Sequence, residues 1–261
     1  MNDEYEEAAE FYDYVVAYAT RGDVEFYVDE ALTAGGPVLE LGCGTGRVLI
    51  PVARAGVTID GLDGSSAMLD RCRAKLEAES DEVKSRVTLH RGDMRTFDLG
   101  KRFALVTIPF RPFQHLLTVD EQLACLRTIH AHLQDGGRLI LDLFNPSLDA
   151  LVNRPSGVEM PEGPPFEMPD GRQVSRSFKV VDPDRFAQVN RIELIYDVTH
   201  TNGRTERHVH AFHMRYLFRF EVEHLLARAG FMVEQLFAGY DRSEYGSTYP
   251  GELIFIARKA A

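Results

Sequence analysis

An acid followed by three closely spaced glycines, within residues 38–47, constrains the fold of this chain more than any other feature. The segment VLELGCGTGR starts like a buried strand, continues into a glycine-rich turn and leads into a helix-like run. A strand, a glycine turn and a helix present backbone N–H groups at a helix N-terminus, a common way to bind a nucleotide-like ligand. The segment therefore predicts an α/β fold with a ligand at this turn.

The spacing of the glycines distinguishes three kinds of ligand site. A phosphate-binding P-loop ends in Lys followed by Ser or Thr, whereas here Arg47 is followed by Val48 and Leu49. A dinucleotide site of the form G-x-G-x-x-G/A needs a small residue where this chain has Arg47. In the remaining pattern, E-x-G-x-G-x-G, the Glu40 carboxylate would repel pyrophosphate and attract a cationic ligand such as S-adenosylmethionine. A turn whose glycines only make a tight corner is the structural alternative.

Two further acids stand where neighbouring strands are expected to end. Residues 57–63 predict a second strand that ends at Asp63, about 20 residues beyond the glycines. Residues 87–94 predict a third strand whose end contains Asp93, after a helical run over 65–79. The carboxyl ends of parallel strands meet at one edge, so we expect the three acids to face one crevice, with Asp63 accepting hydrogen bonds from ribose hydroxyls.

These motifs together resemble the class I S-adenosylmethionine-dependent methyltransferases, closely over residues 36–144 and more loosely over 219–259. The resemblance implies S-adenosylmethionine as cofactor and S-adenosylhomocysteine as its product. It places the methionine moiety at Glu40 and the glycine loop, the ribose at Asp63, and the adenine at Asp93 and Met94. The full set of expected cofactor-binding residues is Glu40, Gly42, Cys43, Gly44, Gly46, Asp63, Gly64, Ser65, Met68, Asp93, Met94 and Ile108. The chain departs from the family at Ala104, where many members carry Asp.

Length, charge and cysteine content favour an enzyme that acts on a small molecule. A chain of 261 residues with 44% hydrophobic residues can bury one sizeable core. Its formal net charge of −11 would repel nucleic acid and an anionic membrane surface, so neither is expected as a partner. Residues 1–7 are acidic, unlike a signal peptide, and the three cysteines lack disulfide or zinc spacing. We expect a cytoplasmic monomer or homodimer.

The order of elements predicts a doubly wound, mostly parallel seven-stranded sheet in a single methyltransferase domain, 1–261. Residues 1–35 would form a cap of two amphipathic helices, 36–144 the cofactor-binding core, and 219–261 its last helix and last two strands. Apart from the elements above, helices are expected over 47–55, 120–133 and 219–229, and strands over 104–110, 138–144, 232–237 and 252–257.

Residues 145–218 interrupt this alternation of strands and helices. Prolines mark a long loop, and three alternating runs near 172–181, 186–198 and 205–217 then predict antiparallel strands, with turns at 182–184 and 201–203. We expect this insertion to cover the crevice and to select the substrate. A dimerisation sheet is the alternative.

Methyl transfer from a sulfonium mainly requires alignment and exclusion of water, so few catalytic side chains are mandatory. His115 is expected to act as a general base, with a pocket-lining role as the alternative. Tyr12, beside Asp13, resembles a Tyr-Asp pair that closes over the cofactor in several small-molecule methyltransferases, and simple packing is the alternative. The expected substrate-binding residues are Phe110, Arg111, Gln114, Arg215 and Tyr216.

Three histidines, His208, His210 and His213, have a spacing that invites a metal site. On an alternating strand the first two share a face and His213 points the other way, so no metal site is expected.

The predicted activity is transfer of a methyl group to an N or O atom of a small-molecule metabolite or natural-product intermediate. A methyltransferase acting on tRNA or protein, and a non-catalytic module that binds S-adenosylmethionine, are the alternatives.

Overall fold

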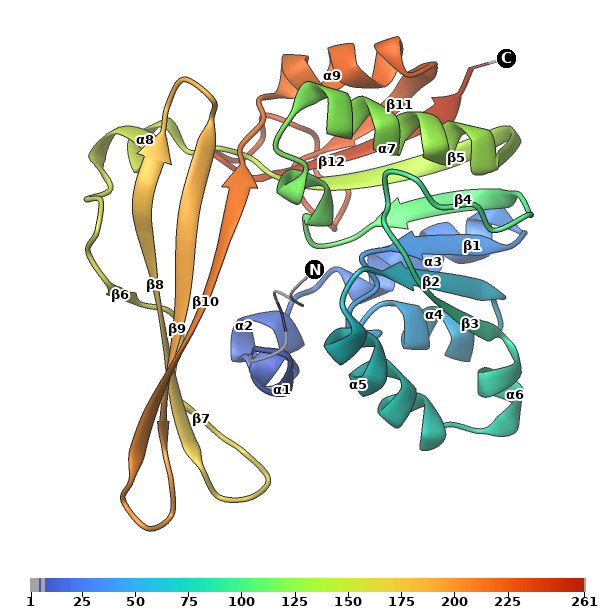
Figure 1. The fold of residues 1–261 in the computed structure, drawn as a ribbon. Coiled ribbons are helices and arrows are strands. Elements are labelled where there is room, and N and C mark those ends of the chain that lie inside the picture. The colour runs from blue at the N-terminus through green and yellow to red at the C-terminus, as the bar shows by residue number, and fades with distance from the viewer. Residues whose placement is uncertain (1–4, 6–7, 261) are drawn as a thin grey trace.

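A computed structural model of the chain describes residues 5 and 8–260 (Figure 1). Residues 1–4, 6–7 and 261 lie outside the described residues, and with them most of the acidic start and the first part of the expected cap. Figure 1 shows a wide sheet covered by helices and a long, strongly twisted sheet beside it, with the first helices of the chain between the two.

Seven strands of the described residues form the wide sheet, in the order β11-β12-β5-β4-β1-β2-β3. Their bounds are β1 Val38–Leu41, β2 Ile59–Asp63, β3 Val87–Arg91, β4 Phe103–Ile108, β5 Leu133–Phe144, β11 Phe231–Phe237 and β12 Glu252–Lys259. β1 is parallel to β2 and β4, whereas β12 is antiparallel to β5 and β11. The predicted seven-stranded, mostly parallel sheet is confirmed. Its strand order reverses between β1 and β4, and ligands of open α/β sheets bind beside such a reversal.

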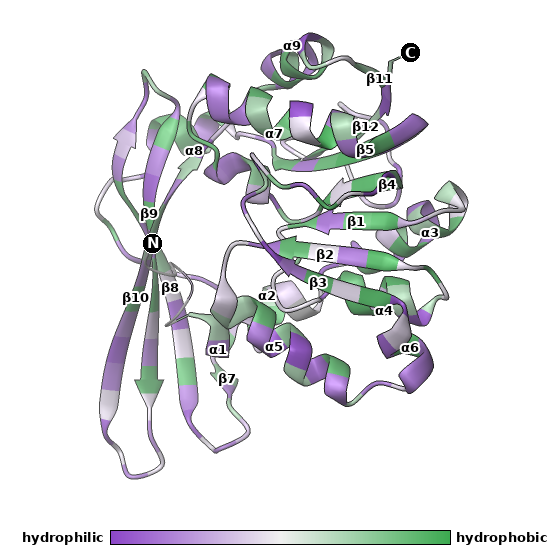
Figure 2. Ribbon diagram, turned by 45° about the vertical axis from the view of Figure 1, so that its right-hand side comes forward, coloured by the Kyte–Doolittle hydropathy of each residue, from purple (hydrophilic) through white to green (hydrophobic). Residues whose placement is uncertain are grey.

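Helices cover both faces of this sheet. They are α3 Val24–Ala34, α4 Leu49–Arg54, α5 Ser66–Glu77, α6 Asp81–Ser85, α7 Val119–His132 and α9 Arg219–Arg228. Apolar residues of α7 and α9 pack on one face, and those of α3, α4 and α5 pack on the other. Figure 2 shows α5 banded in green and purple, as expected for a helix with one buried face. None of the described helices is long and apolar enough to cross a membrane.

The insertion after β5 forms the second, antiparallel sheet, as predicted. Its long strands are β8 Gln173–Asp184, β9 Val189–Thr199 and β10 Thr205–Arg215. The turn expected at 182–184 is wrong, because these residues continue β8. Asp184 instead holds the turn that follows: its Oδ1 accepts hydrogen bonds from the N–H groups of Phe186 and Ala187, both at 2.9 Å. The prolines gave no indication of α8 Leu148–Asn153, β6 Met160–Pro161 or β7 Phe166–Glu167.

Two short helices precede α3, so the described part of the cap has one helix more than expected. α1 Ala9–Tyr12 and α2 Val16–Ala19 pack on the second sheet rather than on the wide one. Phe11 is fully buried there, and its ring stacks on Tyr196 of β9 with the ring centroids 5.0 Å apart. The two helices therefore belong to a separate apolar cluster built on the second sheet.

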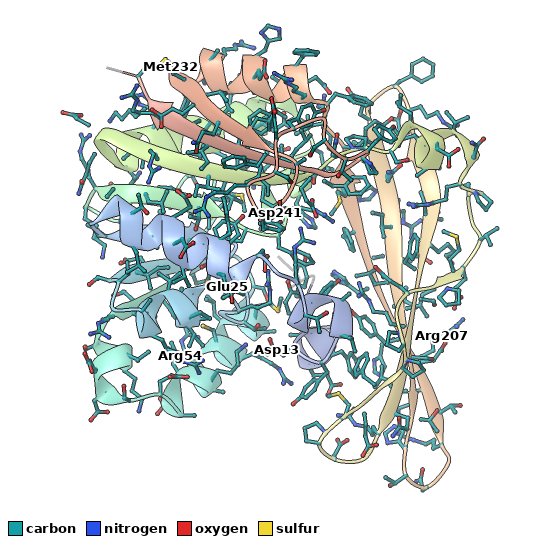
Figure 3. All side chains as sticks on the ribbon, turned by 180° about the vertical axis from the view of Figure 1, so that it is seen from behind. Asp13, Glu25, Arg54, Arg207, Met232 and Asp241 are labelled. Carbon is teal, nitrogen blue, oxygen red and sulfur yellow. The ribbon has the colours of Figure 1, made fainter. Side chains whose placement is uncertain are left out.

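Asp13, just after α1, connects this segment back to the α/β core. Its Oδ1 accepts hydrogen bonds from the Thr45 hydroxyl of the glycine loop (2.6 Å) and from Lys75 Nζ of α5 (2.9 Å). Figure 3 shows Asp13 at this junction between the N-terminal helices and the core. The segment thus touches both walls of the space beside the glycine loop.

Candidate active site

A cavity of about 970 Å³ lies between the carboxyl edge of the wide sheet, the N-terminal helices and the inner face of the second sheet. Its size is at the upper end of the range for small-molecule sites. The predicted residues that line it are Tyr12, Glu40, Gly42, Cys43, Gly44, Asp63, Gly64, Ser65, Met68, Asp93, Met94, Phe110, Arg111, Gln114, His115 and Tyr216. The fold therefore brings together residues from distant parts of the chain around one space.

Three of the predicted site residues do not line this cavity. Ile108 is fully buried in the core, because β4 is covered on both faces. Gly46 has a positive φ of 80°, and a Cβ there would lie 2.6 Å from the Sγ of Cys72, so this glycine allows close packing on α5. Arg215 donates from Nη1 to the Leu117 carbonyl at 3.0 Å and takes no part in the cavity wall.

The glycine loop is fixed by the acid at the end of β2. Asp63 accepts a hydrogen bond from the Gly44 N–H through Oδ2 and another from the Ser65 N–H through Oδ1, both at 2.8 Å. Gly44 has a φ of 54°, a conformation that residues other than glycine rarely adopt. One carboxylate thus sets both the loop after β1 and the start of α5, and a role for Asp63 toward ribose stays a prediction.

Glu40, on β1, is a buried carboxyl group whose hydrogen-bonding capacity the surrounding groups satisfy only in part. It is 2% exposed, and its Oε2 has no hydrogen-bond partner among the described residues. Burial raises the pKa of Glu40 to about 8. Arg47 offsets this rise only in part, because its guanidinium donates to both carboxylate oxygens of Asp23 (2.5 and 2.7 Å). An under-compensated acid beside a glycine loop fits a cationic ligand such as S-adenosylmethionine.

Asp93, after β3, carries a full negative charge at the same edge. Arg95 donates to it from Nε (2.9 and 3.0 Å) and Nη2 (2.6 Å), and these hydrogen bonds lower the pKa of Asp93. Arg95 also donates to Glu121 of α7 at 2.5 Å. The predicted adenine-binding residue is therefore ionised and held in place, although its contact with adenine stays a prediction.

His115 is not suited to the role of general base expected for it. It ends the 3₁₀ helix η1 Pro112–His115, with its ring 5.2 Å from that of Phe212 on β10. Burial lowers the pKa of His115 to about 4, because an imidazolium would be desolvated among aromatic rings. Near neutral pH the side chain is a neutral imidazole, which can accept a hydrogen bond but hold a proton only weakly. The pocket-lining alternative fits this placement.

Tyr12 lines the cavity with its ring 4.9 Å from that of Tyr18. Burial raises the pKa of Tyr12 well above its ordinary value, so its hydroxyl stays protonated. Tyr12 ends α1 and lines the same cavity as the glycine loop, where an aromatic ring would cover a bound ligand. That covering role stays a prediction.

The predicted substrate residues Gln114 and Arg111 are held by other protein groups. Gln114 donates from Nε2 to the Arg215 carbonyl (2.9 Å) and accepts from the Phe144 N–H (2.7 Å), which ties η1 to both sheets. Arg111 donates to Glu252 of β12 at 2.9 Å. A shaping role fits Gln114 better than direct contact with a substrate.

Phe110 and Arg111 form a strained turn after β4, with φ values of 60° and 77°. The buried Asp142 of β5 holds this turn, because its Oδ2 accepts a hydrogen bond from the Phe110 N–H at 3.0 Å. The Tyr240 hydroxyl donates to the same oxygen at 2.5 Å. Strained backbone held by its surroundings is common at functional sites.

Sequence reasoning missed this charged network behind the turn. Arg21 joins it by donating to Glu252 (2.9 Å) and by pairing with Asp23 (3.3 Å). One signal was visible: Asp142 stands inside the otherwise apolar run LILDLF, where an acid must find buried partners.

The histidines of β10 form no metal site in the described part of the chain. His210 is buried on the inner face and His213 is exposed on the outer one, as strand alternation predicted. Among the residues that the structure describes, no group of three potential metal ligands converges.

Comparison with known proteins gives consistent results. Residues 38–137 match a family model described as a methyltransferase domain. A dTDP-3-amino-3,4,6-trideoxy-alpha-D-glucopyranose N,N-dimethyltransferase of Streptomyces venezuelae is 28% identical over 225 residues, which cover 85% of this chain and 86% of the relative.

Two solved structures resemble the whole chain. The CcbJ methyltransferase from Streptomyces caelestis has a TM-score of 0.77 at 25% identity and covers 99% of this chain and 98% of its own. CalS10, an amino pentose methyltransferase from Micromonospora echinaspora solved with S-adenosylmethionine bound, has a TM-score of 0.68 at 25% identity, with coverage of 93% and 94%. Both likenesses extend over the second sheet as well as the core.

Proposed function

Because this chain belongs to the class I S-adenosylmethionine-dependent methyltransferases, as its sequence predicted, we propose that it methylates an amine nitrogen of a small natural-product or amino-sugar acceptor. The observation that carries the choice of nitrogen is the lowered pKa of His115, about 4, beside the space for the acceptor. The names of the relatives support it, since the protein from Streptomyces venezuelae is an N,N-dimethyltransferase of an amino sugar and CalS10 is an amino pentose methyltransferase.

Nitrogen and oxygen acceptors make different demands on the protein. A hydroxyl must lose its proton as it attacks, which calls for a base of suitable pKa. A neutral amine attacks through its lone pair: the N–C bond forms, the C–S bond breaks with its electron pair going to sulfur, and the ammonium product then loses a proton to water. When bound, S-adenosylmethionine supplies a methyl carbon that its sulfonium already activates. A cavity with a weakly basic imidazole and a protonated tyrosine suits the amine.

The residues of the chain take these roles in the proposal. The glycine loop and Asp63 hold the cofactor, Glu40 faces its positive charge, and Asp93 lies toward its adenine. The second sheet excludes water from the acceptor, since it presents apolar side chains such as Phe178 to the cavity. We take the enzyme to act in the cytoplasm as a monomer or homodimer, without nucleic acid or membrane.

Methyl transfer to matched acceptors tests this proposal. The purified chain is incubated with labelled S-adenosylmethionine and with pairs of small molecules in which an amine is replaced by a hydroxyl, and products are read by mass spectrometry. We expect methylation of the amine and none of the hydroxyl analogue. Methylation of hydroxyls, or cofactor binding without transfer to any amine, would contradict the proposal.

A further inference from the structure

The inner face of the second sheet is largely apolar, and the polar side chains that it presents to the cavity include Arg176 of β8, Asn190 of β9 and His210 of β10. On β8 the side chains that line the cavity are Arg176, Phe178 and Val180, and in the register of the sheet they stand opposite Tyr196, Leu194 and Ile192 of β9. Arg176 is only 4% exposed. Placing a guanidinium in such a wall is unfavourable unless paired groups offset the loss of its hydration.

The groups around Arg176 offset its charge only in part. Nη2 donates to the Tyr18 hydroxyl at 2.5 Å, and Glu162 Oε2 lies 3.2 Å from the same nitrogen. Nε and Nη1, which carry three of the five N–H groups of a guanidinium, have no hydrogen-bond partner among the described residues. Glu162 Oε2 also makes no hydrogen bond, so its attraction to Arg176 is electrostatic and loosely directed.

A second arginine adds positive charge to the same wall. Arg154 lines the cavity with its guanidinium 5.2 Å from the ring centroid of Phe178, the next inward-facing residue of β8 after Arg176. Within the described part of the chain Arg154 has no carboxylate partner, and Glu162 is the acid beside Arg176. Among the described residues Arg176 thus has one nearby carboxylate and Arg154 has none, in a protein whose formal net charge is −11. A positively charged wall in a protein whose net charge is negative indicates an anionic ligand.

We propose that Arg176, assisted by Arg154, binds an anionic group of the methyl acceptor, a carboxylate or a phosphate, and so selects acceptors that carry both an amine and an acid. This inference rests on the proposed function, because it names a feature of the same acceptor. Guanidinium groups are suited to both anions, since their N–H donors match carboxylate and phosphate oxygens. Glu162, whose side chain is 37% exposed, can turn toward solvent when the anion takes its place.

The position of Arg176 explains how anion binding would orient the amine. Tyr18, which accepts the Nη2 hydrogen bond, has its ring 4.8 Å from that of Phe110 in the strained turn after β4. Arg176 is thereby connected to the carboxyl edge of the wide sheet, where the cofactor is expected. An acceptor held by its acid at this wall has its other end directed toward that edge.

Binding of matched ligands tests the inference independently of turnover. Calorimetry in the presence of S-adenosylhomocysteine measures the affinity of glucosamine, of its phosphate monoester and of its uronic acid, with inorganic pyrophosphate as a further probe. We expect the wild-type chain to bind at least one anionic ligand about 10- to 100-fold more tightly than glucosamine, the range of a charged hydrogen bond. Whichever anion is preferred assigns the group as phosphate or carboxylate.

Two variants and a matched control assign the effect to this wall. Arg176→Met should abolish the preference and Arg154→Gln should reduce it several-fold. Arg191→Met removes an arginine from β9 that is 46% exposed and paired with Glu193, so it should leave the preference unchanged. Should Arg176→Met fail to fold, the wild-type comparison and Arg154→Gln still decide.

The inference is overturned if no anion, pyrophosphate included, binds wild type better than the neutral amine, or if folded Arg176→Met keeps the preference. Failure of the proposed function looks different: anionic ligands would bind with the expected preference, while no amine accepts a methyl group.

Discussion

Replacing Glu40 by Gln should make the cofactor-free protein more stable and the cofactor complex weaker. Glu40 is 2% exposed, and its Oε2 has no hydrogen-bond partner in the described part of the structure. The native protein therefore favours the neutral acid, whereas the unfolded chain solvates the ionised form. A glutamine has nearly the shape of the neutral acid and carries no such penalty.

The magnitude follows from the pKa of Glu40, which burial raises from 4.5 to about 8. Between these values the native state holds a proton that the unfolded state has lost, so the free energy of unfolding of wild type falls as pH rises. At pH 7 the solution is 7 − 4.5 = 2.5 pH units above the pKa of Glu40 in the unfolded chain. This gap corresponds to about 3 kcal/mol of lost stability. The stabilisation by Glu40→Gln should thus be close to zero near pH 4.5, about 3 kcal/mol at pH 7, and constant above pH 8.

Thermal unfolding and calorimetry measure the two halves of this prediction. At pH 7 the melting temperature of cofactor-free Glu40→Gln should lie roughly 10 °C above that of wild type. In a chain of this size each kcal/mol of stability raises the melting temperature by about 2–4 °C. Affinity for S-adenosylmethionine should fall about 10- to 100-fold, because a charged interaction is lost. Wild type should release a proton on binding the cationic cofactor near neutral pH, and the variant should release none.

Glu30→Gln is the matched control for burial of a glutamate. Glu30 is 5% exposed, but it accepts a hydrogen bond from Arg242 at 2.8 Å and lies 3.4 Å from Arg138. Its replacement should lower stability, since it leaves Arg138 without this carboxylate and leaves Arg242 with Asp29 alone, at 3.6 Å. If Glu40→Gln also lowers the melting temperature at pH 7, or binds cofactor as wild type does, the reasoning about an uncompensated buried acid is refuted.

Three further predictions concern the same site. His115→Asn should leave the pH profile of kcat/KM unchanged, rising with pH as the acceptor amine loses its proton, because the pKa of His115 is about 4. Gly46→Ala should lower the free energy of unfolding by at least about 2 kcal/mol in urea titrations, through its positive φ and the clash with Cys72. Asp23→Asn should cost about 3 kcal/mol in the same assay, because it removes the buried negative charge that pairs with both Arg47 and Arg21.

Each of these has its own control and contrary outcome. If kcat/KM of His115→Asn lost a pH dependence that wild type shows, His115 would be the general base after all. Gly100 has a similar φ of 63° but open space around it, so Gly100→Ala should lower the free energy of unfolding by only about 1 kcal/mol. If both variants lose the same stability, the clash with Cys72 does not contribute at Gly46. Asp70→Asn breaks an exposed pair with Arg73 and should cost under about 0.5 kcal/mol.

The glycine loop and the acids at the strand ends could be predicted because local signals define them. Glycine spacing, apolar runs and turn residues act within about ten residues, and the meeting of strand ends at one edge is a general property of parallel sheets. Glu40, Asp63 and Asp93 therefore line one cavity as expected. The same reasoning separated the two faces of β10 at His210 and His213.

The remaining features depend on contacts between distant parts of the chain, which sequence patterns do not report. His115 has an imidazole at an expected place, but its pKa is set by burial under elements from elsewhere in the chain. Arg21 finds Glu252 across 231 positions of sequence. Nothing in the sequence distinguishes Arg176 from other arginines on alternating strands. The fold shows that its face of β8 lines the cavity.

The two walls of the cavity are encoded in separate stretches of the chain, the donor wall in residues 38–115 and most of the opposite wall in the insertion after β5. The insertion leaves the core at the end of β5 and rejoins it before α9, so it could be exchanged between relatives together with the N-terminal helices that pack on it. If the insertion selects the acceptor, as we propose, a chimaera of this kind would keep its methyl donor and take the acceptor of the relative that contributed the strands.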